Sequence, residues 1–167
     1  MIFGPHEQSV GSTASLNTSA ETIYQLISGK SKELHEDGLP LFVDIRDVAR
    51  AHVLALQNNS VIGKQILLSG EPYTLYEVSL RMELLIPEVP LNERCDLQTV
   101  QLLAKKRPEL RSRLPSLDNA KPETRVIAKI DTSIAREELG LSFMSFEKSL
   151  LDTVDALLEK EKTEWSA

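Results

Sequence analysis

Two carboxylates and a guanidinium stand close together in the first third of the sequence, at Asp44, Arg46 and Asp47. Such a group can serve acid–base chemistry, but each residue also has a structural use. Asp44 follows the apolar run 41–43, where a short carboxylate caps the free N–H groups of a helix. Asp47 completes an acidic variant of the capping box and suits the positive end of the helix dipole. The pattern favours helix caps and an ion pair over a catalytic cluster.

The three histidines are the other side chains that can bind a metal or move a proton. His52 lies on the helix predicted after Asp44, where a lone histidine is more often buried and hydrogen-bonded than catalytic. His6-Glu7 and His35-Glu36-Asp37 lie in predicted loops. Neither has the i, i+4 histidine spacing or the cysteine partners of a zinc site, so we expect no metal.

Strands and helices alternate along the chain, and together they position these residues. Met1–Phe3 is predicted to end a strand that Gly4-Pro5 turns, and a helix is predicted over Thr18–Ser28. A strand–cap–helix joint occupies 41–58, and Gln65–Ser69 is predicted to form a short strand. The alternation favours an α/β layer arrangement.

Apolar residues at helical spacing predict which helix faces are buried. Ser145 is predicted to cap the last helix, Asp131 or Thr132 to cap a short helix before it, and 160–167 to fray. The predicted buried faces are Ala20, Ile23, Leu26 and Ile27; Val48, Ala51, Leu54 and Ala55; and Phe146, Leu150, Val154 and Leu157 or Leu158. The small residues Ala49, Ala51 and Ala55 are expected to let the middle helix lie close against a sheet.

Composition excludes several function classes. A net charge of −6 argues against a binder of nucleic acid or anionic membranes, which needs a basic face. The basic run 105–107, with Arg111 and Arg113, is predicted to be a solvated helix end. Cys95 is the single cysteine, so no intrachain disulfide forms. No run of eighteen apolar residues and no secretory signal is found, which predicts a cytoplasmic protein without a membrane span.

The run Phe42–His52, Phe-Val-Asp-Ile-Arg-Asp-Val-Ala-Arg-Ala-His, resembles a signature segment of the extended short-chain dehydrogenase/reductase superfamily (NAD-dependent epimerase/dehydratase-like). Within that superfamily this run is most similar in sequence to NADPH-dependent carbonyl reductases of the aldehyde, methylglyoxal and dihydroflavonol type. A sugar-nucleotide epimerase or dehydratase is the related alternative. The other matching stretches are Ile2–Pro5, Leu16–Ser19, Asp131–Ser133, Glu138–Gly140, Ser145–Leu150 and Asp152-Thr153.

This resemblance implies an α/β fold: the C-terminal part of a Rossmann-type sheet, with few and mostly parallel strands, plus a largely helical substrate-binding subdomain. Such reductases are about twice as long as this chain, so we expect residues 1–167 to be a single partial domain. Residues 80–99 depart from the family pattern and carry Pro87 and Pro90, which interrupt a helix. We interpret them as an insertion.

Two parts of the reductase machinery are missing from the sequence. The seven glycines are scattered singly, whereas a dinucleotide loop needs them clustered so that backbone N–H groups can approach a pyrophosphate. The family's catalytic Tyr-x-x-x-Lys pair is also absent. The residues four positions after Tyr24, Tyr73 and Tyr76 are Ser28, Glu77 and Leu80. We therefore assign no catalytic residue and expect a fragment that is inactive by itself.

The resemblance places the Ile2 backbone and Ser19 at the cofactor, and Phe3 and Pro5 at the substrate. A hydroxyl and free N–H groups at a helix N-terminus suit a phosphate, although Asn17 and Thr18 can also simply cap the helix. Phe3 can equally be a packing residue at a strand end. The implied cofactor is NADP(H) in the full-length enzyme, with none expected to bind this chain alone.

The function predicted from the sequence is the C-terminal part of an NADP(H)-dependent oxidoreductase that acts on the CH–OH or carbonyl group of an aldehyde or ketone. Its expected partner is a small carbonyl substrate. The alternative is a non-catalytic remnant that associates with another protein through an uncovered sheet edge, because such an edge exposes apolar surface and unpaired strand groups.

Overall fold

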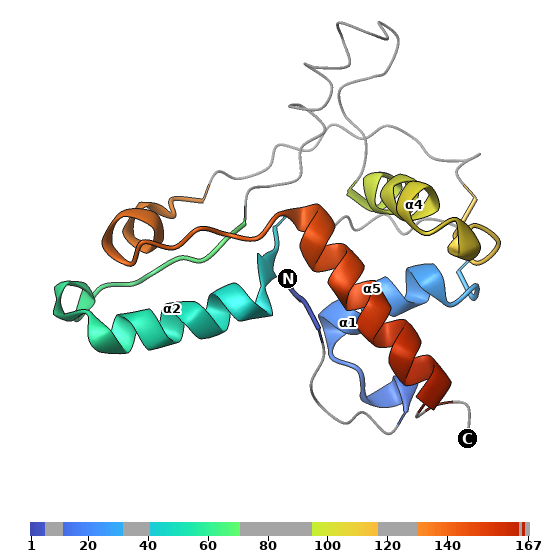
Figure 1. Cartoon of the computed structure of the whole chain (residues 1–167), viewed down its shortest axis with the longest axis horizontal. Helices are drawn as coiled ribbons and strands as arrows, with labels where there is room; N and C mark the ends of the chain where they lie inside the picture. The colour runs from blue at the N-terminus through green and yellow to red at the C-terminus, as the bar shows by residue number, and fades with distance from the viewer. Residues whose placement is uncertain (6–11, 32–40, 71–94, 117–129, 164, 166–167) are drawn as a thin grey trace, which may run out of the picture. The chain divides into compact units, whose positions relative to one another are not determined.

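The computed structural model describes residues 1–5, 12–31, 41–70, 95–116, 130–163 and 165 (Figure 1). The chain divides into two compact units. The first contains 1–23, 41–72 and 128–167, and the second contains 24–40 and 73–127. The predicted loops with His6 and His35, and residues 80–94 of the predicted insertion, lie outside the described residues.

The described elements are mainly helical, with one small parallel sheet, so the molecule is mixed α/β. The strands are β1 (Ile2–Phe3) and β2 (Val43–Asp44), and the α-helices are α1 (Thr18–Ile27), α2 (Ile45–Gln57), α4 (Cys95–Lys106) and α5 (Phe146–Thr163). The short helical turns are η1 (Thr13–Ser15), η2 (Asn59–Val61), η3 (Pro108–Leu110) and η4 (Ile134–Glu138), of which η4 is a π-helix.

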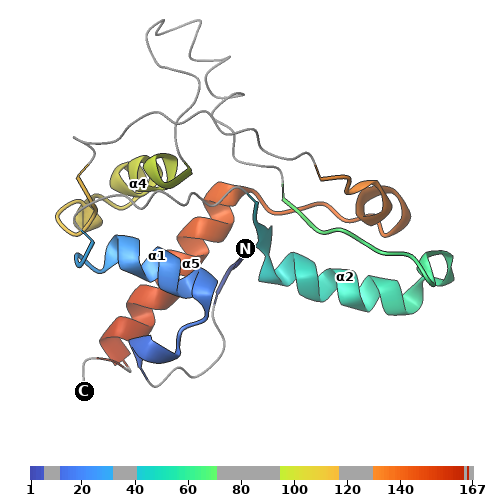
Figure 2. The same ribbon diagram turned by 180° about the vertical axis from the view of Figure 1, so that it is seen from behind.

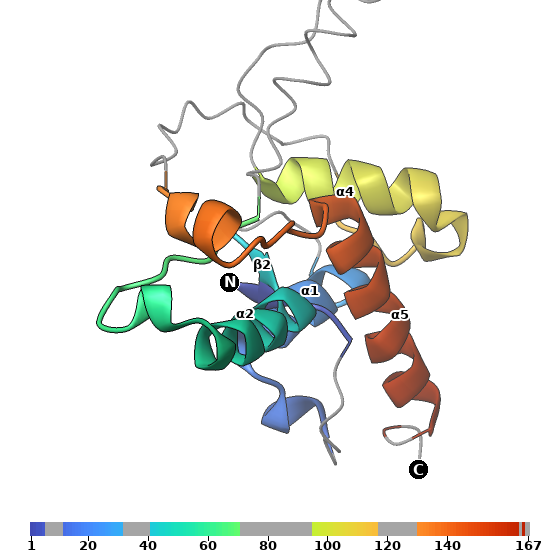
Figure 3. The same ribbon diagram turned by 60° about the vertical axis from the view of Figure 1, so that its left-hand side comes forward.

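The sheet of the first unit pairs β1 with β2 in parallel, with Ile2 opposite Val43 and Phe3 opposite Asp44. Figure 3 shows β2 passing directly into α2, which is the predicted strand–cap–helix joint. The predicted strand Gln65–Ser69 is wrong, because this segment forms no ladder. The Gly70 N–H, just after this segment, donates to the Phe42 carbonyl at 2.8 Å. The Ser69 hydroxyl also bonds the backbone carbonyls of Phe42 and Gly70, which a strand partner would otherwise use.

An aromatic cluster of Phe3, Phe42 and Phe146 fills the space between the sheet and α5. The rings of Phe42 and Phe146 meet edge to face with centroids 5.1 Å apart, and Phe3 lies 6.3 Å from Phe42 and 6.2 Å from Phe146. Such geometry adds to the free energy gained from apolar burial. The predicted stripe of α5 is confirmed, since Phe146, Leu150, Val154 and Leu157 are buried. The predicted fraying is wrong for 160–163, which continue the helix.

A second cluster of buried residues is built from α2, η2 and η4, and Figures 1 and 2 show the segment that follows η2 passing between α2 and η4. Its members are Ala51, Val61, Ala135, Leu139 and Leu141. The Asn58 amide donates to the Glu138 carbonyl at 2.8 Å, and Lys64 pairs with the Glu138 carboxylate at 2.7 Å. The Asp131 carboxylate accepts from the Ser133 N–H at 2.9 Å just before η4, but the N-cap residue of η4 is Ser133, which makes no side-chain cap bond, so neither Asp131 nor Thr132 is the N-cap as predicted.

Two predictions for α2 are corrected. Ala51 is buried as expected, but Ala49 is exposed. His52 is also exposed rather than buried. Its Nδ1 lies 2.8 Å from the Val48 carbonyl one turn earlier, so the ring turns back on its own helix.

The described part of the second unit contains α4 and η3. Val100, Leu102, Leu103 and Leu110 are buried. The basic run closes α4 as predicted: Lys105 and Lys106 occupy its last turn and are exposed. Arg111 Nε donates to the Ala104 carbonyl at 3.0 Å, which satisfies one of the free carbonyls at the helix end. No helix among the described residues is long and apolar enough to cross a membrane.

We predict that Phe146→Ala lowers the free energy of unfolding by about 3–5 kcal/mol, because it removes the ring that both other phenylalanines contact and leaves a cavity. Urea titration followed by circular dichroism measures the loss. Leu56→Ala is the matched control, because Leu56 is 88% exposed and its truncation should change stability by less than about 0.5 kcal/mol. Equal losses in the two variants would contradict the assignment of the core.

Candidate functional site

The first residue of β1 and the first turn of α1 bring together the two residues predicted to meet a cofactor. The Ile2 N–H does not join the sheet but donates to the Ser19 hydroxyl, 3.3 Å away in the first turn of α1. Ile2 is 46% exposed and Ser19 is half-buried. This bond is long for an N–H···O contact, so both groups can exchange it for a ligand atom.

The helix start beside Ser19 is capped locally. Asn17 Oδ1 accepts from the Ala20 N–H at 2.9 Å, which is the capping role that the sequence offered as the simple alternative. That role falls to Asn17, and the Ser19 hydroxyl remains directed at β1. A cap and a hydroxyl directed at β1 therefore occur on the same helix turn.

Phe3 and Pro5, the residues predicted to contact a substrate, differ in accessibility. Phe3 is 2% exposed and belongs to the aromatic cluster, whereas Pro5 is half-buried at the turn that follows. Pro5 retains surface that a small molecule can touch. Phe3 lies behind it as a packing residue, which is the alternative reading that the sequence allowed.

Gly4 makes the turn after β1 possible. Its φ of +124° is a conformation that side chains rarely adopt. A Cβ at this position would lie 2.6 Å from Ile45 Cγ2 and 3.2 Å from Asp44 Oδ1. The Gly4 N–H donates to the Thr153 hydroxyl of α5 at 2.7 Å. The turn is therefore held between the start of α2 and the middle of α5.

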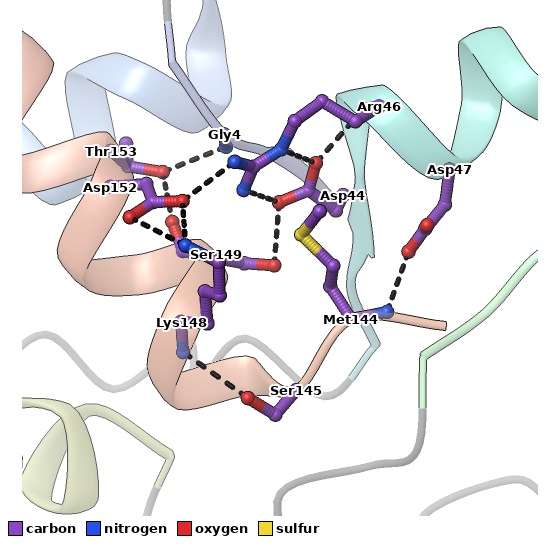
Figure 4. A network of polar contacts seen from close by, with 10 residues as sticks. All are labelled: Gly4, Asp44, Arg46, Asp47, Met144, Ser145, Lys148, Ser149, Asp152 and Thr153. Atoms are coloured by element: carbon purple, nitrogen blue, oxygen red, sulfur yellow. Dashed lines mark hydrogen bonds and ion pairs between the residues drawn. The ribbon is translucent and has the colours of Figure 1, made fainter. Parts of the chain in front are cut away.

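Asp44 is the centre of a polar network at this end of the sheet (Figure 4). Its carboxylate is 0% exposed and accepts four hydrogen bonds. Oδ1 accepts from the Arg46 N–H at 2.9 Å and from Arg46 Nε at 2.8 Å. Oδ2 accepts from Arg46 Nη2 at 2.7 Å and from the Ser149 hydroxyl of α5 at 2.7 Å. The predicted cap and ion pair at the helix start are confirmed.

Arg46 extends the network to α5. Its Nη1 pairs with the Asp152 carboxylate at 2.7 Å, and Lys148 pairs with the same carboxylate at 3.0 Å. The guanidinium is thus divided between a buried carboxylate on the sheet and a partly exposed one on the last helix (Figure 4). Planar, multidentate pairing of this kind is what arginine provides and lysine does not.

Asp47 has a different partner from the one predicted. Its carboxylate accepts from the Met144 N–H at 2.7 Å, so it fastens the segment before α5 instead of closing a capping box with Asp44. The residue is buried, and a carboxylate that reaches a backbone N–H distant in sequence satisfies both groups. The capping-box prediction for Asp47 is therefore wrong in its partner.

The charges of the network fix its protonation. Burial would raise the pKa of Asp44, but the hydrogen bonds from Arg46 and Ser149 outweigh it and hold the pKa below its usual value. Burial would likewise raise the pKa of Asp152, but the hydrogen bonds from Lys148 and Arg46 outweigh it, so this pKa is also lowered. The hydrogen bond to Asp44 raises the pKa of Arg46. The carboxylates stay ionised at neutral pH and act as clamps instead of proton carriers.

Sequence reasoning missed the three residues of α5 that complete the site. Ser149, Asp152 and Thr153 are polar residues three and four apart beside an apolar stripe. Ser149 and Thr153 are buried, whereas polar residues in a row on a helix normally predict an exposed face. The available signal was the i, i+3, i+4 spacing, which places all three on one face.

The fold matches the C-terminal part of a short-chain dehydrogenase/reductase fold of Rossmann type. Over 94–96% of its length the chain is homologous to the C-terminal 40% of NADPH-dependent methylglyoxal reductases and related extended short-chain dehydrogenases/reductases. No family model matches the chain.

Particular relatives illustrate the match. The chain is 28% identical to GRP2 of Candida albicans, provisionally named an NADPH-dependent methylglyoxal reductase, over 94% of this chain and 40% of that protein. It is 30% identical to the cinnamoyl-CoA reductase CAD2 of Medicago truncatula, over 96% and 40%. The chain thus spans about 40% of the length of the curated relatives it matches.

Solved structures agree with this. Gre2 from Candida albicans, crystallised with NADPH, superposes with a TM-score of 0.62 at 27% identity, over 95% of this chain and 41% of that one. The yeast methylglyoxal/isovaleraldehyde reductase Gre2, complexed with NADPH, gives a TM-score of 0.62 at 23% identity, over 96% and 42%, which supports the fold alone.

We predict that the network makes the free energy of unfolding fall at acidic pH. Because the pKa values of Asp44 and Asp152 are lowered on folding, the unfolded chain takes up protons first as the pH falls. The contribution of these two carboxylates to the free energy of unfolding is therefore fully present above about pH 4 and is lost progressively below it. Asp44→Asn should cost about 2–3 kcal/mol at pH 7, and its difference from the natural chain should shrink as the pH falls below about 4.

Urea titrations at several pH values check this. Glu138→Gln is the control, because it disrupts an exposed ion pair with Lys64, which contributes little to stability. A constant difference between Asp44→Asn and the natural chain from pH 7 to acid would contradict the role assigned to the Asp44 charge.

Proposed function

We propose that this chain is the carbonyl-side, C-terminal part of an NADP(H)-dependent oxidoreductase that acts on the CH–OH or carbonyl group of an aldehyde or ketone. The observation that carries the proposal is the juxtaposition of the Ile2 N–H and the Ser19 hydroxyl, 3.3 Å apart on an accessible strand end. The homologous reductases support it, because their names record NADPH dependence and two were crystallised with NADPH.

The chemistry of these residues suits the nicotinamide side of the cofactor. An N–H donor and a hydroxyl, which can donate and accept, complement a carboxamide and a ribose or phosphate oxygen. Ser19 also stands in the first turn of a helix ten residues long, where the dipole favours an anion. In the proposal, Ile2 and Ser19 hold this end of NADP(H), which when bound supplies the hydride for carbonyl reduction.

The carbonyl substrate is proposed to lie beyond the turn after β1. Pro5 offers the accessible surface, and Phe3 keeps the strand end rigid through its contacts with Phe42 and Phe146. The sequence contains neither a Gly-rich loop nor a Tyr-x-x-x-Lys pair. The pyrophosphate cradle and the proton donor are therefore assigned to a nucleotide-binding part outside this sequence, and the cell compartment that we propose is the cytoplasm.

A second candidate is a non-catalytic interaction module. The observation that favours it is the edge of β1 opposite β2, which pairs with no strand among the described residues; there the Ile2 side chain is exposed and its N–H donates to a hydroxyl. An edge of this kind can accept a strand from another chain. In this alternative the surface is the same, but its occupant is a polypeptide.

We predict that the purified chain alone shows no saturable NADPH binding by isothermal titration calorimetry. Mixed with a polypeptide that carries the nucleotide-binding part of Candida albicans Gre2, it should bind NADPH and consume it in the presence of methylglyoxal. Ser19→Ala should raise the Kd of this two-part enzyme by up to about tenfold, since it removes one hydrogen bond. Thr22→Ala, whose hydroxyl bonds only the Thr18 carbonyl of its own helix, is the matched control.

Saturable micromolar binding of NADPH by the chain alone would contradict the assignment of the pyrophosphate cradle to a separate nucleotide-binding part. Stable association without NADPH consumption, seen by size-exclusion chromatography and absorbance at the same time, would favour the interaction module.

A further inference from the structure

We propose that Thr153 is a positioning residue for the turn after β1: its hydroxyl, on the last helix, sets the direction of the backbone that carries Ile2 and Pro5. The inference rests on the proposed function, because it gives this turn the task of presenting groups to cofactor and substrate. The juxtaposition that carries it is the 2.7 Å contact between the Gly4 N–H and Thr153 Oγ1, across 149 positions of the chain.

The direction of the Thr153 hydroxyl is unambiguous. An N–H can only donate, so Oγ1 accepts from Gly4; a backbone carbonyl can only accept, so the hydroxyl proton goes to the Ser149 carbonyl, 2.6 Å away. Both ends of the hydroxyl are thus used. Thr153 is 2% exposed, so water cannot readily take its place. The result is a relay from the backbone of α5 to the backbone of the β1 turn.

The turn has no room to move away from this contact. On the other side, Gly4 lies so close to Ile45 and Asp44 that even a Cβ would not fit. The turn is therefore clamped from two sides, by a hydroxyl of α5 and by the start of α2. Only Phe3 separates Gly4, whose N–H is clamped, from Ile2, whose N–H is proposed to face the cofactor.

The helix that carries Thr153 is itself anchored by separate contacts. Ser149 donates to Asp44 at 2.7 Å, and Asp152 pairs with Arg46 at 2.7 Å (Figure 4). These contacts hold α5 against β2 and α2 without touching β1. Loss of the Thr153 hydroxyl should therefore release the turn while α5 stays in place, which separates positioning from general stability.

The test compares Thr153→Val, which keeps the shape but loses the hydroxyl, with Thr153→Ser, which keeps the hydroxyl. Thr163→Val is the matched control, since the Thr163 hydroxyl also bonds the carbonyl one turn earlier, Glu159, but is exposed. In the full chain, amide hydrogen exchange measured by NMR should show the Gly4 N–H exchanging at least tenfold faster in Thr153→Val. Thr153→Ser and Thr163→Val should stay within threefold of the natural chain.

The second readout is catalytic and uses the two-part enzyme with the nucleotide-binding part of Candida albicans Gre2. Thr153→Val should lower kcat/KM for methylglyoxal at least tenfold at a temperature where the protein remains folded, and Thr153→Ser should restore it to within threefold. Should Thr153→Val fail to fold, Thr153→Ala serves in both measurements.

Unchanged Gly4 exchange in the hydroxyl-free variant would overturn the proposal. Equal losses of kcat/KM in Thr153→Ser and Thr153→Val would do the same, because they would indicate packing instead of the hydroxyl. If the natural two-part enzyme never consumes NADPH, the proposed function fails, whereas the Gly4 exchange still decides whether Thr153 holds the turn.

Discussion

The buried carboxylate of Asp44 is the interaction on which the first unit depends. It ends β2, caps α2, neutralises Arg46 and accepts a hydroxyl from α5, all through two oxygen atoms. A buried charge is costly unless it is paired and hydrogen-bonded on every side, and here each oxygen accepts two bonds. One of these four bonds comes from Ser149, so this requirement ties α5 to the end of the sheet. The Asp44 carboxylate thus contributes both to the stability of the first unit and to the geometry at the strand ends.

Local features of this site could be predicted from the sequence, because local physics decides them. The apolar run before Asp44 and the helical spacing after it indicated the joint, and a short carboxylate at that point has few other uses. The same holds for the Ser145 cap, which accepts from the Lys148 N–H, and for the buried stripe of α5. The family resemblance supplied what periodicity could not, namely that the ends of β1 and α1 meet.

The rest depended on contacts between residues far apart in the chain. Asp47 was assigned to its own helix, but its carboxylate reaches the Met144 N–H, 97 positions away. Residues 65–69 carry the apolar run Ile-Leu-Leu at their centre, and Ile66 and Leu68 do pack on the apolar cluster of α2, yet no described strand completes a ladder. His52 follows the helical pattern but lies on its solvent side. In each case the local pattern was recognised in the sequence, but the partner or the exposure of the side chain was determined by tertiary structure.

The long sequence separation between α5 and the residues that it holds also bears on how the protein is made. Gly4 and Asp44 meet their partners on α5 across 149 and 105 positions. Contacts of such range form late, since a long loop must close before they add any stability. During synthesis the aromatic side chains of Phe3 and Phe42, and the charge of Asp44, therefore stay without the helix that covers them until it leaves the ribosome. In that interval the nascent chain exposes a hydrophobic strand end, the kind of surface that chaperones recognise.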